Sequence, residues 1–298
     1  YNNHGGDRMK SNLIGAITER MPTLSKGQKR IARFILEHYD SAAFMTANKL
    51  GREVQVSEST VVRFASEVGY EGYPQLQKAL QELIRNRLTT VQRMEVTSEQ
   101  LGDSDILSKV LTMDIEKIRR TLEEQSNEGF EAAADSIIAA RNIYILGIRS
   151  SAALAQFMNF YFNQIFPNVR LVTGSSASEM FEQIFRIGPG DVFIGISFPR
   201  YSKRTVKAID FAKERGATVI AITDSAGSPL AAGCDHLLKA RSDMASFVDS
   251  LVAPLSLINA LIVAVGMRRQ REVGETYAQL EKIWDEYDVY EKNEENVI

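Results

Sequence analysis

Hydroxyl and guanidinium side chains gather after short apolar runs in the second half of the chain. The runs at 142–147 and 191–197 lack polar alternation, as strands buried on both faces of a sheet do. Where helices begin after such runs, backbone amides can bind an anion, hydroxyls add donors, and arginine can hold phosphate with two donors. These residue types predict an anion site. Its candidate residues are Ser150, Ser151, Ser197, Arg200, Ser202 and Thr205.

The same hydroxyls could serve a purely structural role, because each could be an ordinary N-cap of a helix. In an open parallel sheet, however, the carboxyl ends of the strands meet at one edge, and ligands bind there. Several loops bring hydroxyls to this edge, and two of them add arginine. We therefore expect a phosphorylated small molecule to bind there. The loops concerned are 147–151, 174–176, 197–205 and 224–225.

A second group of hydroxyls, with one arginine, lies in the first half of the chain. Thr46 and Ser57 are predicted N-caps of two short helices joined by a tight turn, and Gly69 ends the second helix. Short hydroxyls at a helix start, with an arginine one turn later, suit a helix in the DNA major groove. The alternative is a helical hairpin with a solvated polar face. The candidate DNA contacts on this helix are Ser57, Ser59, Thr60 and Arg63.

The helix before this hairpin carries a basic face. Ser25 and Gln28 match a capping box, which predicts a helix start. The basic face could follow a phosphate backbone or could be solvated surface, and the hairpin that follows favours phosphate contact. Lys29 and Arg33 are our candidate contacts on this face, which also holds Lys26 and Arg30.

Length and composition fit two soluble domains of different charge. The chain has 298 residues, 44% of them hydrophobic and 24% charged, which is ordinary for globular protein. Residues 9–88 hold 12 Lys/Arg against 8 Asp/Glu, whereas 89–298 hold 22 against 29. A single cysteine, Cys234, excludes an internal disulfide framework. With no apolar run of membrane-spanning length and no signal peptide, we expect a cytoplasmic protein and no membrane partner.

The periodicity of the sequence predicts two domains and a linker. Residues 9–88 should form an all-α helix-turn-helix bundle, and 89–103 lack a period and should be the linker. Residues 104–298 alternate helices and strands, which predicts an α/β fold, a doubly wound parallel sheet in an α/β/α sandwich. We expect residues 1–8 to lie outside the fold. We also expect a long helix at 106–125, with Ile106, Val110, Met113, Ile118 and Leu122 roughly on one face.

The first half of the chain resembles the N-terminal domain of RpiR-family transcription regulators. The resemblance is carried by VSESTVVRF at 56–64 and GYEGYPQLQKAL at 69–80. One position departs from the family, because Gln55 stands where the turn usually has glycine. A left-handed glutamine is uncommon and mildly strained, so the turn could be built differently here.

The second half, about 132–265, looks like a sugar isomerase (SIS) domain, which has a flavodoxin-like sheet. The similar segments are YILGIRSSA, PGDVFIGISF and RGATVIAITDS. The resemblance implies a phosphorylated sugar or related anionic metabolite as effector. The usual phosphate loop, Ser-x-Ser-Gly-x-Thr, is altered at Pro199 and Arg200. Proline removes an amide donor and arginine adds charge, so Arg200 could hold the phosphate, or the ligand could be another anion.

We expect no catalytic residue, no metal and no cofactor. A sugar-phosphate isomerase needs a general acid/base beside the sugar. Glu179 and Glu182 could serve, but glutamates at a helix start are more often partners of the helix dipole. The sequence has no zinc spacing and no Walker loop. A sugar-phosphate isomerase with a fused helical domain, a scaffold protein, and a regulator with a vestigial pocket remain as alternatives.

The combined prediction is a ligand-responsive transcription regulator. Residues 9–88 would bind a palindromic, double-stranded operator, and 104–298 would bind the effector. Paired recognition helices must meet half-sites about one helical turn apart, so we expect a homodimer or homotetramer. Effector binding would shift the relative placement of the paired DNA-binding domains.

Overall fold

A computed structural model of the chain describes residues 13–84, 105–174, 176–242 and 248–291. The chain divides into two compact units, Tyr1–Asp103 and Ser104–Ile298, and each is described by itself. The residues predicted as leader and as linker, 1–8 and 89–103, lie outside the described ranges.

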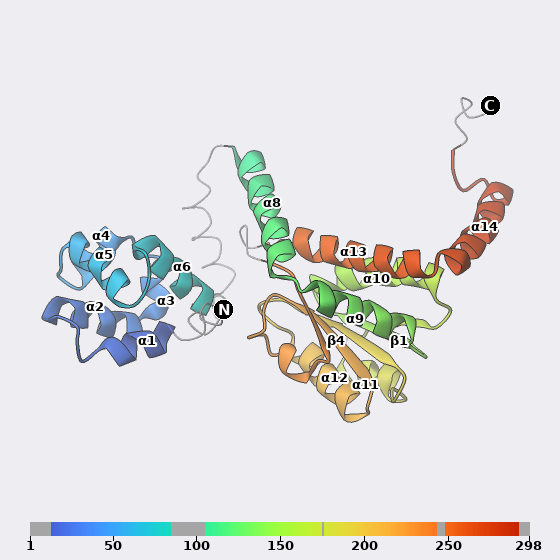
Figure 1. Ribbon diagram of the computed structural model, residues 1–298, viewed down its shortest axis with the longest axis horizontal. Coiled ribbons are helices and arrows are strands. Elements are labelled where there is room, and N and C mark those ends of the chain that lie inside the picture. Colours follow the sequence, from blue (N-terminus) through green and yellow to red (C-terminus); the bar gives the residue numbers. More distant parts are fainter. Residues whose placement is uncertain (1–12, 85–104, 175, 243–247, 292–298) are drawn as a thin grey trace. The chain divides into compact units, whose positions relative to one another are not determined.

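The first unit consists of helices (Figure 1). Ser25 and Gln28 form the predicted capping box, and the Thr46 hydroxyl accepts a hydrogen bond from the Lys49 amide at 3.2 Å. The apolar core takes Ile31 from the second helix and Phe64 from the fifth, both fully buried. The described helices are α1 (Leu13–Arg20), α2 (Lys26–Glu37), α3 (Tyr39–Ala42), α4 (Ala47–Glu53), α5 (Glu58–Glu67) and α6 (Tyr73–Ile84).

The turn between α4 and α5 is tight, with a left-handed residue at its centre. Gln55 has φ of 55°, so glutamine adopts the conformation that glycine usually supplies, and Arg30 Nη2 donates to its carbonyl at 2.8 Å. Helix α4 also approaches the start of α5 closely. A Cβ added at Gly51 would lie 2.8 Å from the carbonyl oxygen of Val56, so only glycine fits there without displacement.

Helix α6 fixes the backbone that leads into α4. The Tyr73 hydroxyl and Gln77 Nε2 both donate to the Met45 carbonyl, at 2.6 and 3.0 Å. Gln81 Nε2 donates to the Ala43 carbonyl at 3.0 Å. Burial raises the pKa of Tyr73 to about 12, so its hydroxyl stays a donor at any physiological pH.

The second unit is a five-stranded parallel sheet with helices on both faces, which confirms the predicted fold class. The strand order is β2-β1-β3-β4-β5, the flavodoxin-like order, in which β2 is added on one side of β1 and the later strands on the other, so the topological switch point lies between β1 and β3. The strands are β1 (Ile143–Gly147), β2 (Val169–Leu171), β3 (Val192–Ile196), β4 (Thr218–Thr223) and β5 (His236–Lys239). The helices are α8 (Ile106–Glu124), α9 (Asn127–Ile138), α10 (Ser151–Ile165), α11 (Ala177–Ile184), α12 (Lys203–Glu214), α13 (Val252–Arg268) and α14 (Gln270–Glu286).

Two apolar cores hold these layers together. One lies between the sheet and α9, α10 and α13, and the other lies between the sheet and α11 and α12 (Figure 1). Buried aliphatic side chains such as Ile194 and Ile220 fill the strands without polar alternation, as the sequence predicted.

Asp191 ties the amino ends of the central strands together. Its buried carboxylate accepts two hydrogen bonds from Arg141, at 2.9 and 2.8 Å, one from Asn142 at 2.9 Å and one from the Gly188 amide at 3.0 Å. Burial alone would raise the pKa of Asp191, but these hydrogen bonds and the Arg141 charge hold it below its usual range.

The expected single apolar face of α8 is wrong. Val110 and Met113 are half-buried against the sheet unit, whereas Ile106, Ile118 and Leu122 are exposed. The buried residues of α8 are instead polar, Lys117 and Thr121.

Helix α14 leaves the layered part of the unit. Its axis turns by 97° from α13, and none of its residues is buried. Taken singly, none of the helices in the described ranges is long and apolar enough to cross a membrane, and α13 and α14 pass that test only as this bent pair.

Candidate DNA-contact helix and anion-binding edge

Helix α5 buries one face and exposes the other. Val61, Phe64 and Ala65 lie in the helical core, whereas Ser59 and Arg63 are exposed. This division follows from apolar residues spaced three and four apart, and it leaves the polar face open to a partner.

Three hydroxyls cluster at the exposed start of α5. Ser57 Oγ lies 2.9 Å from Ser59 Oγ and 2.8 Å from Thr60 Oγ1. Ser57 occupies the predicted N-cap position, but its hydroxyl bonds to these neighbours and accepts no hydrogen bond from the backbone. Arg63 Nε donates to the Ser59 carbonyl at 3.3 Å, which brings the guanidinium to the same end of the helix. The structure thus gathers all four predicted contacts into one patch.

Helix α2 packs beside α5 and contributes basic residues. Arg33 is exposed and Lys29 is half-buried. A Cβ at Gly27 would meet Val56 and Thr60 at 3.4 and 3.5 Å, so the start of α2 lies close to the start of α5. Exposed Glu58 accepts a hydrogen bond from Asn48 Nδ2 at 3.1 Å. The patch therefore offers hydroxyl donors and cations, and the Glu58 carboxylate beside it is already hydrogen-bonded to Asn48.

The hydroxyls after β3 form a chain of caps at the start of α12. Ser197 is buried, and its Oγ accepts a hydrogen bond from the Ser202 amide at 3.1 Å. Ser202 Oγ in turn accepts from the Thr205 amide at 3.3 Å. Arg200 is exposed. Thr205 is fully buried, and among the described residues its Oγ1 is one of two buried side-chain polar atoms without a hydrogen-bond partner.

The loop after β1 contributes the other candidates. Arg149 has a left-handed backbone with φ of 59°, and such conformations concentrate at ligand sites. Ser150 is exposed at the N-cap of α10, and Ser151 is buried in its first turn.

A cavity of about 170 Å³ lies at the carboxyl edge of the sheet, between the ends of β1 and β2 and the starts of α10 and α12. Its polar lining comes from Arg149, Gln156, Thr173 and Arg204, and Met180 and Leu146 contribute apolar surface. None of the six predicted effector contacts is among its described lining residues. They are close in sequence to its lining residues. Ser197 and Ser202 form hydrogen bonds within the cap of α12, and Ser151 is buried in the first turn of α10.

The sequence placed Arg149 and Arg204 in the right loops but did not select them. Hydroxyl residues were favoured over arginines, and the signal that could have corrected this was the presence of an arginine in each of the two loops, Arg149 after β1 and Arg204 in the first turn of the helix after β3. Two guanidinium groups beside an apolar hollow suit a ligand that has an anionic group and an uncharged body.

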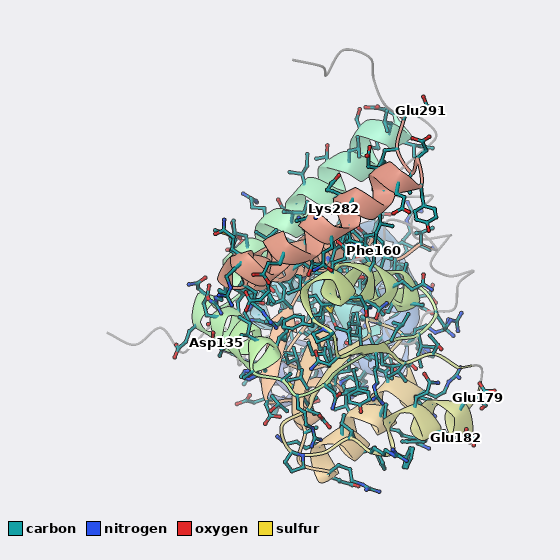
Figure 2. All side chains as sticks on the ribbon, turned by 90° about the vertical axis from the view of Figure 1, so that its right-hand side faces the viewer. Asp135, Phe160, Glu179, Glu182, Lys282 and Glu291 are labelled. Atoms are coloured by element: carbon teal, nitrogen blue, oxygen red, sulfur yellow. The ribbon has the colours of Figure 1, made fainter. Side chains whose placement is uncertain are left out.

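The two glutamates considered as acid/base groups lie on α11 (Figure 2). Glu179 forms a capping box with Ser176, and Glu182 accepts a hydrogen bond from Ser178 Oγ at 2.9 Å. Both are exposed, and neither is among the described lining residues of the cavity. Within the described ranges, no group of three or more His, Cys, Asp or Glu residues could hold a metal ion.

Comparison with known proteins gives matches to both halves in the same order. Residues 11–87 match the helix-turn-helix domain of the rpiR family, and residues 136–264 match the SIS domain. The HTH-type transcriptional regulator HexR of Pseudomonas aeruginosa is 27% identical over 267 residues, covering 87% of this chain and 90% of that protein.

Two solved structures share the fold. The sugar isomerase domain of an RpiR transcription factor from Sphaerobacter thermophilus is 30% identical with a TM-score of 0.56, covering 59% of this chain and 97% of that one. The Vibrio vulnificus NanR protein complexed with ManNAc-6P is 21% identical with a TM-score of 0.57, covering 93% of this chain and 99% of that one.

Proposed function

We propose which residues of this chain contact operator DNA and which bind its effector, on the premise that the chain belongs to the RpiR family of helix-turn-helix transcription regulators. The protein is a DNA-binding regulator with a SIS domain that senses a sugar phosphate. Residues 9–88 form the DNA-binding domain, 89–103 the linker and 104–298 the effector domain. The regulator works in the cytoplasm, where its operator and sugar phosphates are found.

The exposed patch at the start of α5 carries the DNA-binding part of the proposal. Ser57, Ser59, Thr60 and Arg63 lie together on the outward face, and this geometry lets a helix start enter the major groove. Lys29 and Arg33 on α2 lie along the phosphate backbone. The regulator binds a palindromic operator as a homodimer or homotetramer, because one copy of α5 contacts one half-site.

Arg63 tests whether this patch distinguishes sequences. An operator is first selected from random duplexes, and affinity is then measured by fluorescence anisotropy. Arg63→Ala should cost about 1–3 kcal/mol on the operator and little on random DNA if the guanidinium contacts a base. Arg271→Ala, at an exposed arginine on α14, is the matched control. Equal weakening on both duplexes would instead assign Arg63 to a phosphate.

The carboxyl edge of the sheet carries the effector part of the proposal. The phosphate lies between the start of α12, where the buried Thr205 hydroxyl is unpaired, and the guanidinium groups of Arg149 and Arg204. The sugar body occupies the hollow between β1 and β2. Ser150, Ser151, Ser197, Arg200 and Ser202 complete the surroundings as cap or loop residues.

A thermal-shift screen of sugar phosphates and sugar acids tests this site. A ligand at one hundred times its Kd stabilises the unit that binds it by about 2.7 kcal/mol. Arg149→Ala should abolish the shift, and Arg271→Ala should preserve it. A shift that survives Arg149→Ala would place the ligand elsewhere. The coupling is tested in the same samples, because the effector should change operator affinity at every salt concentration.

The isomerase alternative makes a different prediction for the same cavity. Aldose–ketose conversion needs a proton-transferring group beside the sugar, and the described lining contains no carboxylate and no histidine. We therefore propose that the protein is a regulator without isomerase activity. Turnover of an aldose or ketose phosphate by the purified chain would overturn this.

A further inference from the structure

The turn between α4 and α5 has the hydrogen bonds of a helix that ends at glycine, but glutamine stands at its centre. The Gln55 amide donates to the Arg52 carbonyl at 3.2 Å. The Val56 amide donates to the Gly51 carbonyl at 2.8 Å. These two bonds make a Schellman motif, in which the left-handed residue is usually glycine because a Cβ is unfavourable there. Gln55 has φ of 55°, so its own side chain disfavours the backbone conformation that the turn requires.

A side chain from outside the hairpin holds this turn. The amides of Gln55 and Val56 are both used within the hairpin, and the Gln55 carbonyl accepts its hydrogen bond from α2 instead. Arg30 Nη2 is the donor, at 2.8 Å. A charged donor makes a stronger hydrogen bond than a neutral one. Because the direction of this carbonyl depends on the backbone angles of Gln55, the bond favours the left-handed conformation.

Helix α2 meets the start of α5 at a second point, one turn before Arg30. Gly27 and Arg30 are three residues apart and therefore lie on the same side of α2. A Cβ added at Gly27 would lie 3.4 Å from Val56 Cγ1 and 3.5 Å from Thr60 Cγ2. The segment that leads into α5 is thus held by α4 through Gly51 and by α2 through Gly27 and Arg30. A change in the turn would alter the direction in which α5 leaves it.

The direction of α5 matters most for contacts with bases. The patch of hydroxyls and arginine on α5 begins at Ser57, two residues after Gln55. Hydrogen bonds to base edges need correct distances and angles at once. Attraction to phosphates is electrostatic and independent of sequence. A small rotation of α5 would therefore weaken binding to an operator more than binding to random DNA.

We infer that Arg30 is a positioning residue for DNA recognition, because its bond to the Gln55 carbonyl fixes the angle at which α5 enters the major groove. The inference rests on the proposed function, since it requires α5 to be the helix that contacts bases. It gives Arg30 a different role from Arg33, the exposed arginine one turn further along α2, which the proposed function places at a phosphate.

A double-mutant cycle on DNA affinity tests this role. Fluorescence anisotropy measures the affinity of the full chain for the selected operator and for random DNA. Arg30→Ala should lower the ratio of the two affinities about 5- to 20-fold. Gln55→Gly alone should keep the wild-type ratio. In the Gln55→Gly background, Arg30→Ala should change the ratio less than about 2-fold, because glycine adopts the left-handed conformation without help. The lost charge enters both backgrounds equally and cancels in the cycle.

Arg33→Ala is the matched comparison on the same helix. It should weaken binding to both duplexes alike and reduce the slope of log affinity against log salt by about 1. Arg30→Ala should leave that slope unchanged. A variant that merely lowered the stability of the helical unit would lose affinity for both duplexes equally, so the ratio separates positioning from a general structural role. Circular dichroism checks that each variant is folded at the assay temperature.

Three results would overturn the inference. They are an unchanged ratio for Arg30→Ala, an equal fall in the ratio in both backgrounds, and equal weakening on both duplexes with a smaller salt slope, which would make Arg30 a phosphate contact. Failure of the proposed function looks different, because the wild-type chain would then select no operator from random duplexes. That result would overturn the inference as well, whereas the first three leave the proposed function intact.

Discussion

Gly51 offers a test of how the helix-turn-helix is packed. Its Cα faces the backbone at the start of α5, and a methyl group there would lie 2.8 Å from the Val56 carbonyl oxygen. A backbone atom cannot rotate away as a flexible side chain can. Gly51→Ala must therefore separate α4 from α5 or tilt one against the other.

Two opposing effects determine how much Gly51→Ala lowers the free energy of unfolding of the helical unit. Overpacking of this kind costs about 1–3 kcal/mol. Alanine is better than glycine inside a helix by about 0.8–1 kcal/mol. The net destabilisation of the helical unit is therefore about 1 kcal/mol, with an upper limit near 2. For a unit of this size, each kcal/mol lowers Tm by about 4–8 °C.

Gly274 in α14 is the matched control. It is also inside a helix, but an added Cβ meets nothing within 4 Å. Gly274→Ala should therefore leave stability unchanged or raise it by up to about 1 kcal/mol. Thermal unfolding of the full chain is followed by circular dichroism, together with operator affinity, which Gly51→Ala should also lower. A Gly51→Ala protein that melts at or above the wild-type temperature would refute the close approach of α4 and α5.

Three further predictions concern single hydrogen-bonding groups. Tyr73→Phe should cost only about 0.5–1.5 kcal/mol in urea unfolding, because Gln77 still donates to the Met45 carbonyl, and adding Gln77→Ala should cost clearly more. Thr205→Val should not lower the free energy of unfolding, since the buried hydroxyl has no partner, but should weaken sugar-phosphate binding about 2- to 10-fold by calorimetry. The lowered pKa of Asp191 means that its stabilising effect is present at neutral pH and is lost as the pH falls below about 4, through the folded-state pKa. Asp191→Asn should flatten this part of the acid unfolding curve, and an unchanged curve would contradict it.

The sequence predicted well what local patterns determine. The capping box at Ser25 and the N-cap at Thr46 depend on residues three apart, and both are present. The parallel sheet followed from unalternated apolar runs, because such runs need cover on both faces. Gln55 adopts the left-handed conformation that the turn demands, so tertiary packing outweighed the preference of the residue.

What the sequence could not supply was the direction of side chains that depend on distant partners. Ser197 Oγ accepts a hydrogen bond from the Ser202 amide, a partner in the helix cap that the residue types alone did not indicate. The rotation of α8 depends on amides more than one hundred residues away, at Lys239 and Arg241. Periodicity alone cannot distinguish two stripes of aliphatic residues when one helix carries both.

The hydrogen bonds between α8 and the end of β5 predict that the two sides of this junction tolerate substitutions to different extents. Thr121 and Gln125 accept from main-chain amides, which residues 239 and 241 supply whatever their side chains are, proline excepted. Replacement of Lys239 or Arg241 therefore keeps both main-chain hydrogen bonds, although an Arg241 variant loses the ion pair with Glu124 at 3.7 Å. Replacement of Thr121 or Gln125 by an apolar residue instead leaves an amide without its acceptor. The main-chain side of this junction keeps its two donors through most substitutions, whereas residues 121 and 125 are held to side chains that can accept a hydrogen bond.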